Sequence, residues 1–405
     1  MALLICASDY DMVVIMKELV IDKLGDNQRL DKYLSKYLSA ASKSFIYKML
    51  RKKNITLNNK KADGSEKLVM GDSVKIFFAD ETLEKFTEGK YKAGSESNGT
   101  SAANASKDSL NRDEINAASD NNGQHIKNTK DNKNASYDYE AIYKPLDIVY
   151  ENEDVLLINK PSGMLSQKSV PADVSLIEYL TAYMLHNGSI SYDDLHIFHP
   201  GICNRLDRNT SGIVAAGKTM KGLQELSTHF KERTLNKYYI CIVAGEVRKR
   251  QLVKGYLKKD HKSNKVTIYD KLPAAKTGTM AASKNNKSRE DEYLPIETEY
   301  MPLVSNGELT LLKIHLITGR SHQIRAHLAS LSHPLAGDYK YGDAAFNRYM
   351  KDRYRCSSQM LHSYELDIPD MDIHVHTDIP ELFVNVLKGE DIWEPGIPEA
   401  LEVLH

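Results

Sequence analysis

The chain has 405 residues, of which 41% are hydrophobic and 27% charged, and a formal net charge of −1. This composition is typical of a globular protein with about two or three domains. No stretch approaches the roughly 20 apolar residues of a membrane span, which argues against a membrane protein.

The cysteines and the N-terminus both favour a cytoplasmic protein. The four cysteines lie far apart and form no CxxC pair, which favours reduced thiols over a disulfide framework or a structural zinc site. The opening stretch carries Asp9 and Asp11 and has no basic segment, so it is a poor secretory signal. One interpretation is that it is upstream sequence ahead of a start at Met16.

The net charge conceals a segregation of charge along the chain. Residues 29–61 contain ten Lys and Arg against one acid, a local net of +9, whereas residues 364–405 contain eleven acids against one Lys, a local net of −10. A basic concentration at one end favours a polyanionic partner such as nucleic acid. The alternative is an ordinary solvated, lysine-rich surface.

A small module is predicted over residues 16–80. RLDKYLSKYLS has the apolar spacing of a helix, and SKSFIYKMLRKK is a second amphipathic helix that Ser42 or Ser44 can cap. ITLNNKKADG predicts a strand and a turn at Asn58 and Asn59, and GDSVKIFF alternates like a closing strand.

A disordered linker is predicted next, over residues 81–137. Residues 89–136 are rich in Asn, Ser, Ala, Lys and Asp and nearly empty of large apolar residues. Such a segment cannot bury enough surface to offset its ordering entropy. A second polar insertion, AASKNNKSREDE, is expected to form a surface loop.

A larger domain is predicted over residues 138–405. Apolar strands are expected at DVLLINK, SGIVAAG, KYYICIVA and LTLLKIHL, and helices at MKGLQELSTHFKER and SHQIRAHLASLSHP, the latter stopped by Pro334. Strands outnumber helices without a regular βαβ alternation. This pattern predicts an α+β fold with a mixed, largely antiparallel sheet.

The stretch NRLDRNTSG places Asp207 between Arg205 and Arg208. Nearby positive charge keeps a carboxylate ionised, and an ionised carboxylate is a competent nucleophile at a sugar carbon. In an extended segment Arg205 and Asp207 would lie on one face. Taken alone, such a pattern is more often a surface ion pair than a catalytic site.

The stretch LITGRSHQIRAHLA predicts a strand, a turn and a helix with Arg320, His322, Gln323 and Arg325 near its start. Donors clustered at the positive end of a helix can meet a phosphate or a carboxylate, and a solvated basic helix start is the alternative. His322 and His327 are five residues apart, which misses the i,i+4 spacing of a metal-binding pair. We therefore expect no metal site.

Adjacent tyrosines occupy the apolar strand KYYICIVAGEV. Successive side chains of a strand point to opposite faces, so one tyrosine can pack in the core while the other faces the working side of the sheet. The alternative is that both tyrosines are structural. A face with an aromatic ring, a carboxylate and arginines would suit a base lifted out of a nucleic-acid stack.

These stretches, in this order, resemble the motifs of the RluA-type RNA pseudouridine synthases. NRLDRNTSGIVAAGKT is similar to the family's HRLDxxTSGLLLxAK motif, and DVLLINKPSGMLSQ, KYYICIVAGEV and LITGRSHQIRAHLASLSHPLAGDYKYGD are similar to its other three. The basic module resembles an S4 RNA-binding domain, in the version found on ribosomal large subunit pseudouridine synthase C. The resemblance covers nearly the whole chain outside the linker.

The resemblance implies a fold with a central cleft and four catalytic residues. Asp207 would attack the target uridine, Arg205 would enter the RNA stack, Tyr239 would pack against the flipped base and Arg325 would pair with the aspartate. It also implies an RNA partner, most plausibly 23S ribosomal RNA, and neither a metal nor an organic cofactor. We expect further RNA contacts from basic residues of the module and of the closing motif: Lys43, Lys48, Arg51, Lys52, Lys53, Arg320 and His322.

Asn204 departs from the family, which usually has histidine before Arg-Leu-Asp. We expect activity to survive, because this position is not the nucleophile. Three other interpretations stay open: a non-catalytic RNA-binding or ribosome-assembly factor, a synthase that acts on transfer RNA, and a nucleosidase-type hydrolase. The chain is expected to act as a monomer in the cytoplasm.

Overall fold

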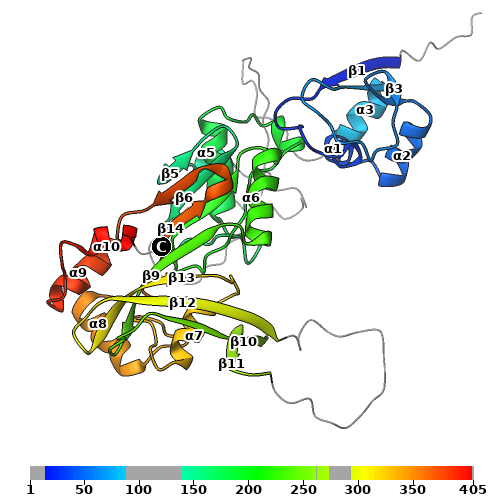
Figure 1. The fold of residues 1–405 in the computed structure, drawn as a ribbon. Helices are drawn as coiled ribbons and strands as arrows, with labels where there is room; N and C mark the ends of the chain where they lie inside the picture. Colours follow the sequence, from blue (N-terminus) through cyan, green and yellow to red (C-terminus); the bar gives the residue numbers. More distant parts are fainter. Residues whose placement is uncertain (1–13, 88–137, 261, 273–292, 404–405) are drawn as a thin grey trace, which may run out of the picture.

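The computed structural model describes residues 14–87, 138–260, 262–272 and 293–403, which form two β-sheets with helices packed on them (Figure 1). Three predictions fall at least partly outside these residues: the upstream sequence before Met16, most of the linker, and the surface loop at AASKNNKSREDE.

The N-terminal module is a four-stranded antiparallel sheet in the order β1-β4-β2-β3, with two helices. Its elements are β1 (Val14–Val20), α1 (Leu30–Tyr37), α2 (Lys43–Arg51), β2 (Ile55–Leu57), β3 (Lys60–Lys61) and β4 (Ser73–Ala79). Ser42 caps α2 by accepting a hydrogen bond from the Phe45 amide at 3.2 Å. Asn58 and Asn59 have φ of 50° and 61°, as the tight turn between β2 and β3 requires.

Helix α3 (Asp80–Thr87) corrects the predicted start of the linker at residue 81. Leu83 and Phe86 pack on the core of the module, and the Phe86 ring lies 4.6 Å from that of Phe45 between centroids. These two apolar side chains suffice to hold one more helix, although the surrounding composition is polar. The remaining linker residues, 88–137, lie outside the described residues.

The larger domain has an eleven-stranded sheet, and this confirms the predicted mixed, largely antiparallel fold. Nine strands follow the order β11-β10-β12-β13-β9-β14-β8-β6-β5, while β15 pairs with β14 and β7 with β8. Of the strand pairs described, β8–β14 is parallel and the others are antiparallel. The strands are β5 (Ile148–Glu151), β6 (Val155–Lys160), β7 (Gly201–Ile202), β8 (Ser211–Gly217), β9 (Asn236–Ala244), β10 (Gln251–Asp260), β11 (Lys265–Tyr269), β12 (Leu294–Ser305), β13 (Leu309–His315), β14 (Leu361–Ile368) and β15 (Ile373–His376).

Helices cover this sheet on both faces (Figure 1). They are α4 (Tyr139–Ile142), α5 (Leu176–His186), α6 (Met220–Glu232), α7 (Gln323–Ser330), α8 (Ala344–Tyr354), α9 (Glu381–Gly389) and α10 (Ile397–Val403). Strand β9 therefore packs against a different core on each face. Tyr239 and Cys241 belong to the core that contains the α5 side chains, whereas Ile240 and Ile242 belong to the core under α8 and α9. A strand buried on both faces reads as a continuous apolar run.

The parallel pair β8–β14 brings two backbones unusually close. Gly212, in the Thr-Ser-Gly of the Asp207 stretch, has φ of +106°, and a Cβ there would lie 2.2 Å from the Ser363 carbonyl oxygen. Only glycine fits this position.

Helix α7 ends before the predicted stop at Pro334, at Ser330. Ser332 has a left-handed φ of 66°, the Ser332 amide donates to the Ala329 carbonyl, and the His333 amide donates to the Leu328 carbonyl at 2.9 Å. This is a Schellman motif, which satisfies the last carbonyls of a helix and reverses the chain. The proline therefore follows a helix that has already ended.

The module contacts the larger domain beside α6 (Figure 1). The Asn27 side chain donates to Gln224 Oε1 at 2.8 Å, Lys23 pairs with Glu153 at 2.9 Å, and Ile197 packs against the core of the module.

Candidate active site

Asp207 lies in the loop between β7 and β8, and the loop is held from both sides. On the β8 side, the Asn204 amide group donates to the Ile213 carbonyl at 3.2 Å and accepts from the Ala215 amide at 2.8 Å. Asn204 thus pairs with the backbone of β8 much as a neighbouring strand would. The residue that departs from the family pattern fixes the start of the Asp207 loop.

The chain after β6 holds the other side of this loop. The Ser166 hydroxyl donates to the Leu206 carbonyl at 2.8 Å and accepts from the Leu206 amide at 3.0 Å. The fully buried Lys160 ammonium donates to the Arg208 carbonyl at 3.1 Å. Burial lowers the pKa of Lys160 to about 8, which the negative charge of Asp207 partly opposes. Hydrogen bonds therefore hold the backbone of both residues next to Asp207, Leu206 and Arg208.

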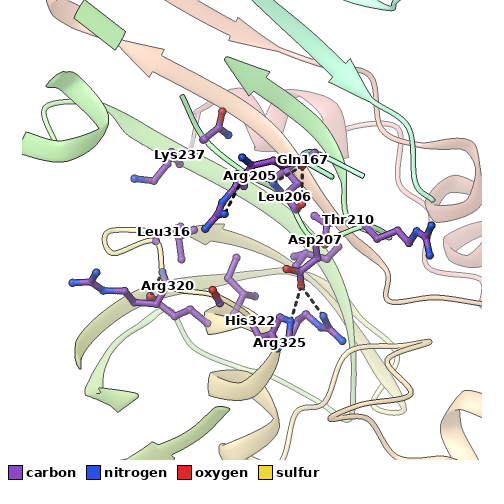
Figure 2. Close-up of a pocket in the computed structure, with 18 of the residues that line it drawn as sticks. Gln167, Arg205, Leu206, Asp207, Thr210, Lys237, Leu316, Arg320, His322 and Arg325 are labelled. Carbon is purple, nitrogen blue, oxygen red and sulfur yellow. Dashed lines mark hydrogen bonds and ion pairs between the residues drawn. The ribbon is translucent and has the colours of Figure 1, made fainter. Parts of the chain in front are cut away.

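Arg325 of α7 contacts the Asp207 carboxylate directly (Figure 2). Arg325 Nη1 lies 2.6 Å from Asp207 Oδ2, and His322 Nε2 lies 3.8 Å from the same oxygen. In the described part of the chain, neither Arg205 nor Arg208 forms an ion pair with Asp207, whereas Arg325, the partner that the resemblance implied, does. Leu206 packs into the core between them, and Arg205 turns instead to Gln167 Oε1 at 3.3 Å.

A second carboxylate, Asp338, fixes the Arg325 guanidinium. Arg325 donates through Nε to Asp338 Oδ2 at 2.7 Å and through Nη2 to Oδ1 at 2.9 Å. Burial would raise the pKa of the fully buried Asp338, but the hydrogen bonds and charge of Arg325 outweigh it and hold the pKa below its usual value. Sequence analysis did not single out Asp338; its place in the GDYKYGD motif, 13 residues after Arg325, was the available signal.

The two tyrosines of β9 point to opposite faces, as predicted. Tyr239 is buried and lines the cleft, and burial raises its pKa to about 12. Tyr238 stacks on His315 on the other face, with 4.8 Å between ring centroids.

Asp207 faces a cleft of about 850 Å³ (Figure 2). Its lining also includes Arg205, Tyr239, Arg320, His322 and Arg325. Asp207 is the one carboxylate in this lining, against nine Lys and Arg: Lys168, Arg205, Arg208, Lys231, Arg233, Lys237, Lys259, Arg320 and Arg325. The cleft can therefore attract a polyanion, and its lining presents a single carboxylate.

The basic residues predicted in the module lie apart from this cleft. None of them lines it, and all are exposed on α2 or on the turn that follows: Lys43, Lys48, Arg51, Lys52 and Lys53. The buried face of α2, with Ile46 and Leu50, holds the helix on the module so that the cations face solvent. The structure thus forms two basic surfaces, one at Asp207 and one on α2.

The described residues contain neither a candidate metal site nor a candidate membrane span. Among them, no group of three or more His, Cys, Asp or Glu side chains is placed to hold a metal ion. None of the helices described is both long and apolar enough to cross a membrane.

Comparison with known proteins agrees with this geometry. Residues 154–330 match the model of the RNA pseudouridylate synthase family, and residues 28–74 match that of the S4 domain. Ribosomal large subunit pseudouridine synthase C of Vibrio vulnificus is 28% identical over 372 residues, which cover 92% of this chain and 93% of that protein. Ribosomal large subunit pseudouridine synthase D of Borreliella burgdorferi is 31% identical over 229 residues, 55% of this chain and 61% of that protein.

Among solved structures, human RNA pseudouridylate synthase domain containing 4 is similar, with a TM-score of 0.48 and 21% identity over 61% of this chain and 94% of that one. The two family matches and the long alignment to a synthase of the same length carry the assignment. The chain belongs to the RNA pseudouridylate synthase family and carries an S4 domain, which makes it a pseudouridine synthase.

Proposed function

We propose that this enzyme converts uridines of large-subunit ribosomal RNA to pseudouridine, with Asp207 as the nucleophile. The observation that carries the proposal is the Asp207 carboxylate itself, held by Arg325 at 2.6 Å in a cleft lined by nine cations and no other acid. The relatives named as large-subunit synthases support the choice of ribosomal RNA.

The reaction is an isomerisation and balances without an oxidant or reductant. The Asp207 carboxylate attacks the sugar of the target uridine, and the bond between the sugar and N1 breaks, with its electron pair leaving on the base. The base rotates and rejoins through C5, and Asp207 departs as a free carboxylate. The C5 proton is lost and N1 gains one, so no redox cofactor is called for.

Three residues around Asp207 receive roles in this proposal. Arg325 holds the Asp207 carboxylate in the cleft, because the Arg325 guanidinium is itself fixed by Asp338. Tyr239 offers a buried ring against which the detached base can pack. Arg205, exposed at the cleft and bonded only weakly to Gln167, is available to enter the RNA stack.

The two basic surfaces divide RNA binding between them. We propose that residues 16–80 form the RNA-binding module and 138–405 the catalytic domain, joined by the linker, and that one copy of the chain acts alone. Cations on α2 contact phosphates of a structured element, while Arg320 and His322 contact the strand in the cleft.

The test is pseudouridine mapping of ribosomal RNA from cells that lack this protein, complemented with wild type, Asp207→Asn or Asp343→Asn. Asp343 is a matched control, because it is an exposed N-cap of α8 and asparagine caps a helix equally well. We expect discrete large-subunit positions to lose pseudouridine and to regain it with wild type and Asp343→Asn but not with Asp207→Asn.

Other outcomes select another function. If no ribosomal position changes but a transfer RNA position does, the enzyme acts on transfer RNA. If Asp207→Asn complements as well as wild type, the nucleophile is wrong and an RNA-binding or assembly role takes its place.

A further inference from the structure

A buried lysine at the end of the cleft has no acceptor for its ammonium group among the described residues. Lys237, the second residue of β9, is 9% exposed and lines the cleft (Figure 2). In the described part of the chain its ammonium has no carboxylate and no hydrogen-bond acceptor, and the nearest ring, Phe230, lies 6.0 Å from Nζ. Burial, together with the positive charge of Arg233, lowers the pKa of Lys237 to about 8. An ammonium without an acceptor in such surroundings costs free energy.

Other cations converge on the same end of the cleft. Arg233 ends helix α6 in a left-handed conformation with φ of 61°, and Lys231 precedes it by two residues. Arg320 comes from the loop before α7, and its Nε is buried with no hydrogen-bond partner. In Figure 2, Lys237, Arg205 and Arg320 all lie to the left of the Asp207–Arg325 pair, with Leu316 between Lys237 and Arg320. Lys237 and Arg320, from different elements, thus line the same cleft, and neither Lys237 Nζ nor Arg320 Nε has an acceptor among the described residues.

We propose that Lys237, Arg233 and Arg320 form a subsite for one backbone phosphate of the RNA strand, next to the nucleotide on which Asp207 acts. This inference rests on the proposed function, since it places the same RNA in the same cleft. Ammonium and guanidinium groups without counter-ions match a phosphate, which offers several strong acceptor oxygens to both. The bound phosphate supplies the acceptor that Lys237 lacks and fixes the strand relative to Asp207.

With this subsite, the RNA phosphate binds without disturbing the ion pair between Arg325 and the Asp207 carboxylate. The cations that meet the phosphate come from α6, β9 and the loop before α7, whereas the cation that holds Asp207 is already paired with Asp338. Phosphate binding and control of the nucleophile are therefore assigned to different side chains.

The test compares Lys237→Met, Lys237→Arg and Lys254→Met in the full chain. Methionine keeps the length of the lysine stem, arginine keeps the charge, and Lys254 is an exposed lysine of β10 outside the cleft lining. The probe is a single-stranded oligouridylate, with binding measured over a series of salt concentrations. Thermal unfolding of each variant checks that it is folded.

For Lys237→Met we expect binding weakened about tenfold or more, as for loss of one hydrogen bond to a charged group. The slope of log K against log salt should fall by about 0.7, the value for one phosphate contact on a single strand. Lys237→Arg and Lys254→Met should keep the slope of wild type. Arg320→Gln should lower the slope as well, which keeps the test decisive if Lys237→Met does not fold.

Two results would overturn the subsite. An unchanged affinity and slope for folded Lys237→Met would mean that no phosphate reaches this lysine. A weaker affinity with an unchanged slope would mean that Lys237 contacts a base and not a phosphate. The proposed function is judged separately, because Asp207→Asn is scored by pseudouridine mapping and Lys237→Met by salt-dependent binding.

Discussion

Replacement of Asp338 by asparagine tests whether the geometry of the active site depends on a residue that does not line the cleft. Asp338 Oδ2 accepts from Arg325 Nε at 2.7 Å, and Oδ1 accepts from Arg325 Nη2 and from the amides of Lys340 and Tyr341. The asparagine oxygen can replace Oδ1. Its amide nitrogen would then face Arg325 Nε, so that two donors oppose each other and a full negative charge is lost.

The magnitude follows from the burial of this pair. Asp338 is fully buried and Arg325 is 8% exposed, so removing one charge leaves the other without compensation. We expect Asp338→Asn to lower the free energy of unfolding by about 3–5 kcal/mol. Without the Asp338 carboxylate, the Arg325 guanidinium no longer holds the Asp207 carboxylate in position. A displacement of about 1 Å can reduce the rate about 100-fold.

Urea unfolding at pH 7 and single-turnover pseudouridine formation measure the two effects. The control is Asp343→Asn, the same chemical change five residues along at an exposed helix cap. If Asp338→Asn stays within about 0.5 kcal/mol of wild type, as surface substitutions do, and keeps its rate, then Asp338 does not fix Arg325 and the reasoning fails.

Three further predictions concern other parts of the chain. Asn204→Ala removes both hydrogen bonds between this side chain and the backbone of β8, so urea unfolding should show a free energy of unfolding lower by about 2–4 kcal/mol. A decrease of less than about 1 kcal/mol would mean that other contacts hold the loop. Burial lowers the pKa of His362 to about 3, so the unfolded state binds the proton more tightly and stability falls as the pH drops below about 6.5. Between pH 7 and pH 4.5 the loss should be about 2–3 kcal/mol, and His362→Asn should show a correspondingly smaller loss in the same titration. Neutralising Arg51 and Lys52 together with glutamine should weaken RNA binding and lower its salt slope by about 1–2, while unfolding stays unchanged because both are exposed; an unchanged slope would remove the basic surface on α2 from the RNA interface.

The sequence by itself was sufficient for the local elements of this protein. The apolar run of β9 predicted a strand, and the Asn58-Asn59 pair predicted the turn after β2. Hydrophobic periodicity and turn-forming residues identify strands and turns, because these elements depend on neighbours within a few residues. The same locality made the predicted stop of α7 wrong, since a Schellman motif centred on a serine has no glycine to announce it.

Only the tertiary structure decided how the active-site side chains pair. The resemblance to the family implied that Arg325 pairs with Asp207, but the residues alone left a surface ion pair with Arg205 or Arg208 as the alternative. The observed partner lies 118 residues away in the chain and is itself fixed by Asp338. The absence of an acceptor for Lys237 among the described residues was equally invisible, because it depends on how distant segments pack around this side chain. Pairing across a sheet is set by packing and burial, and a single sequence records neither.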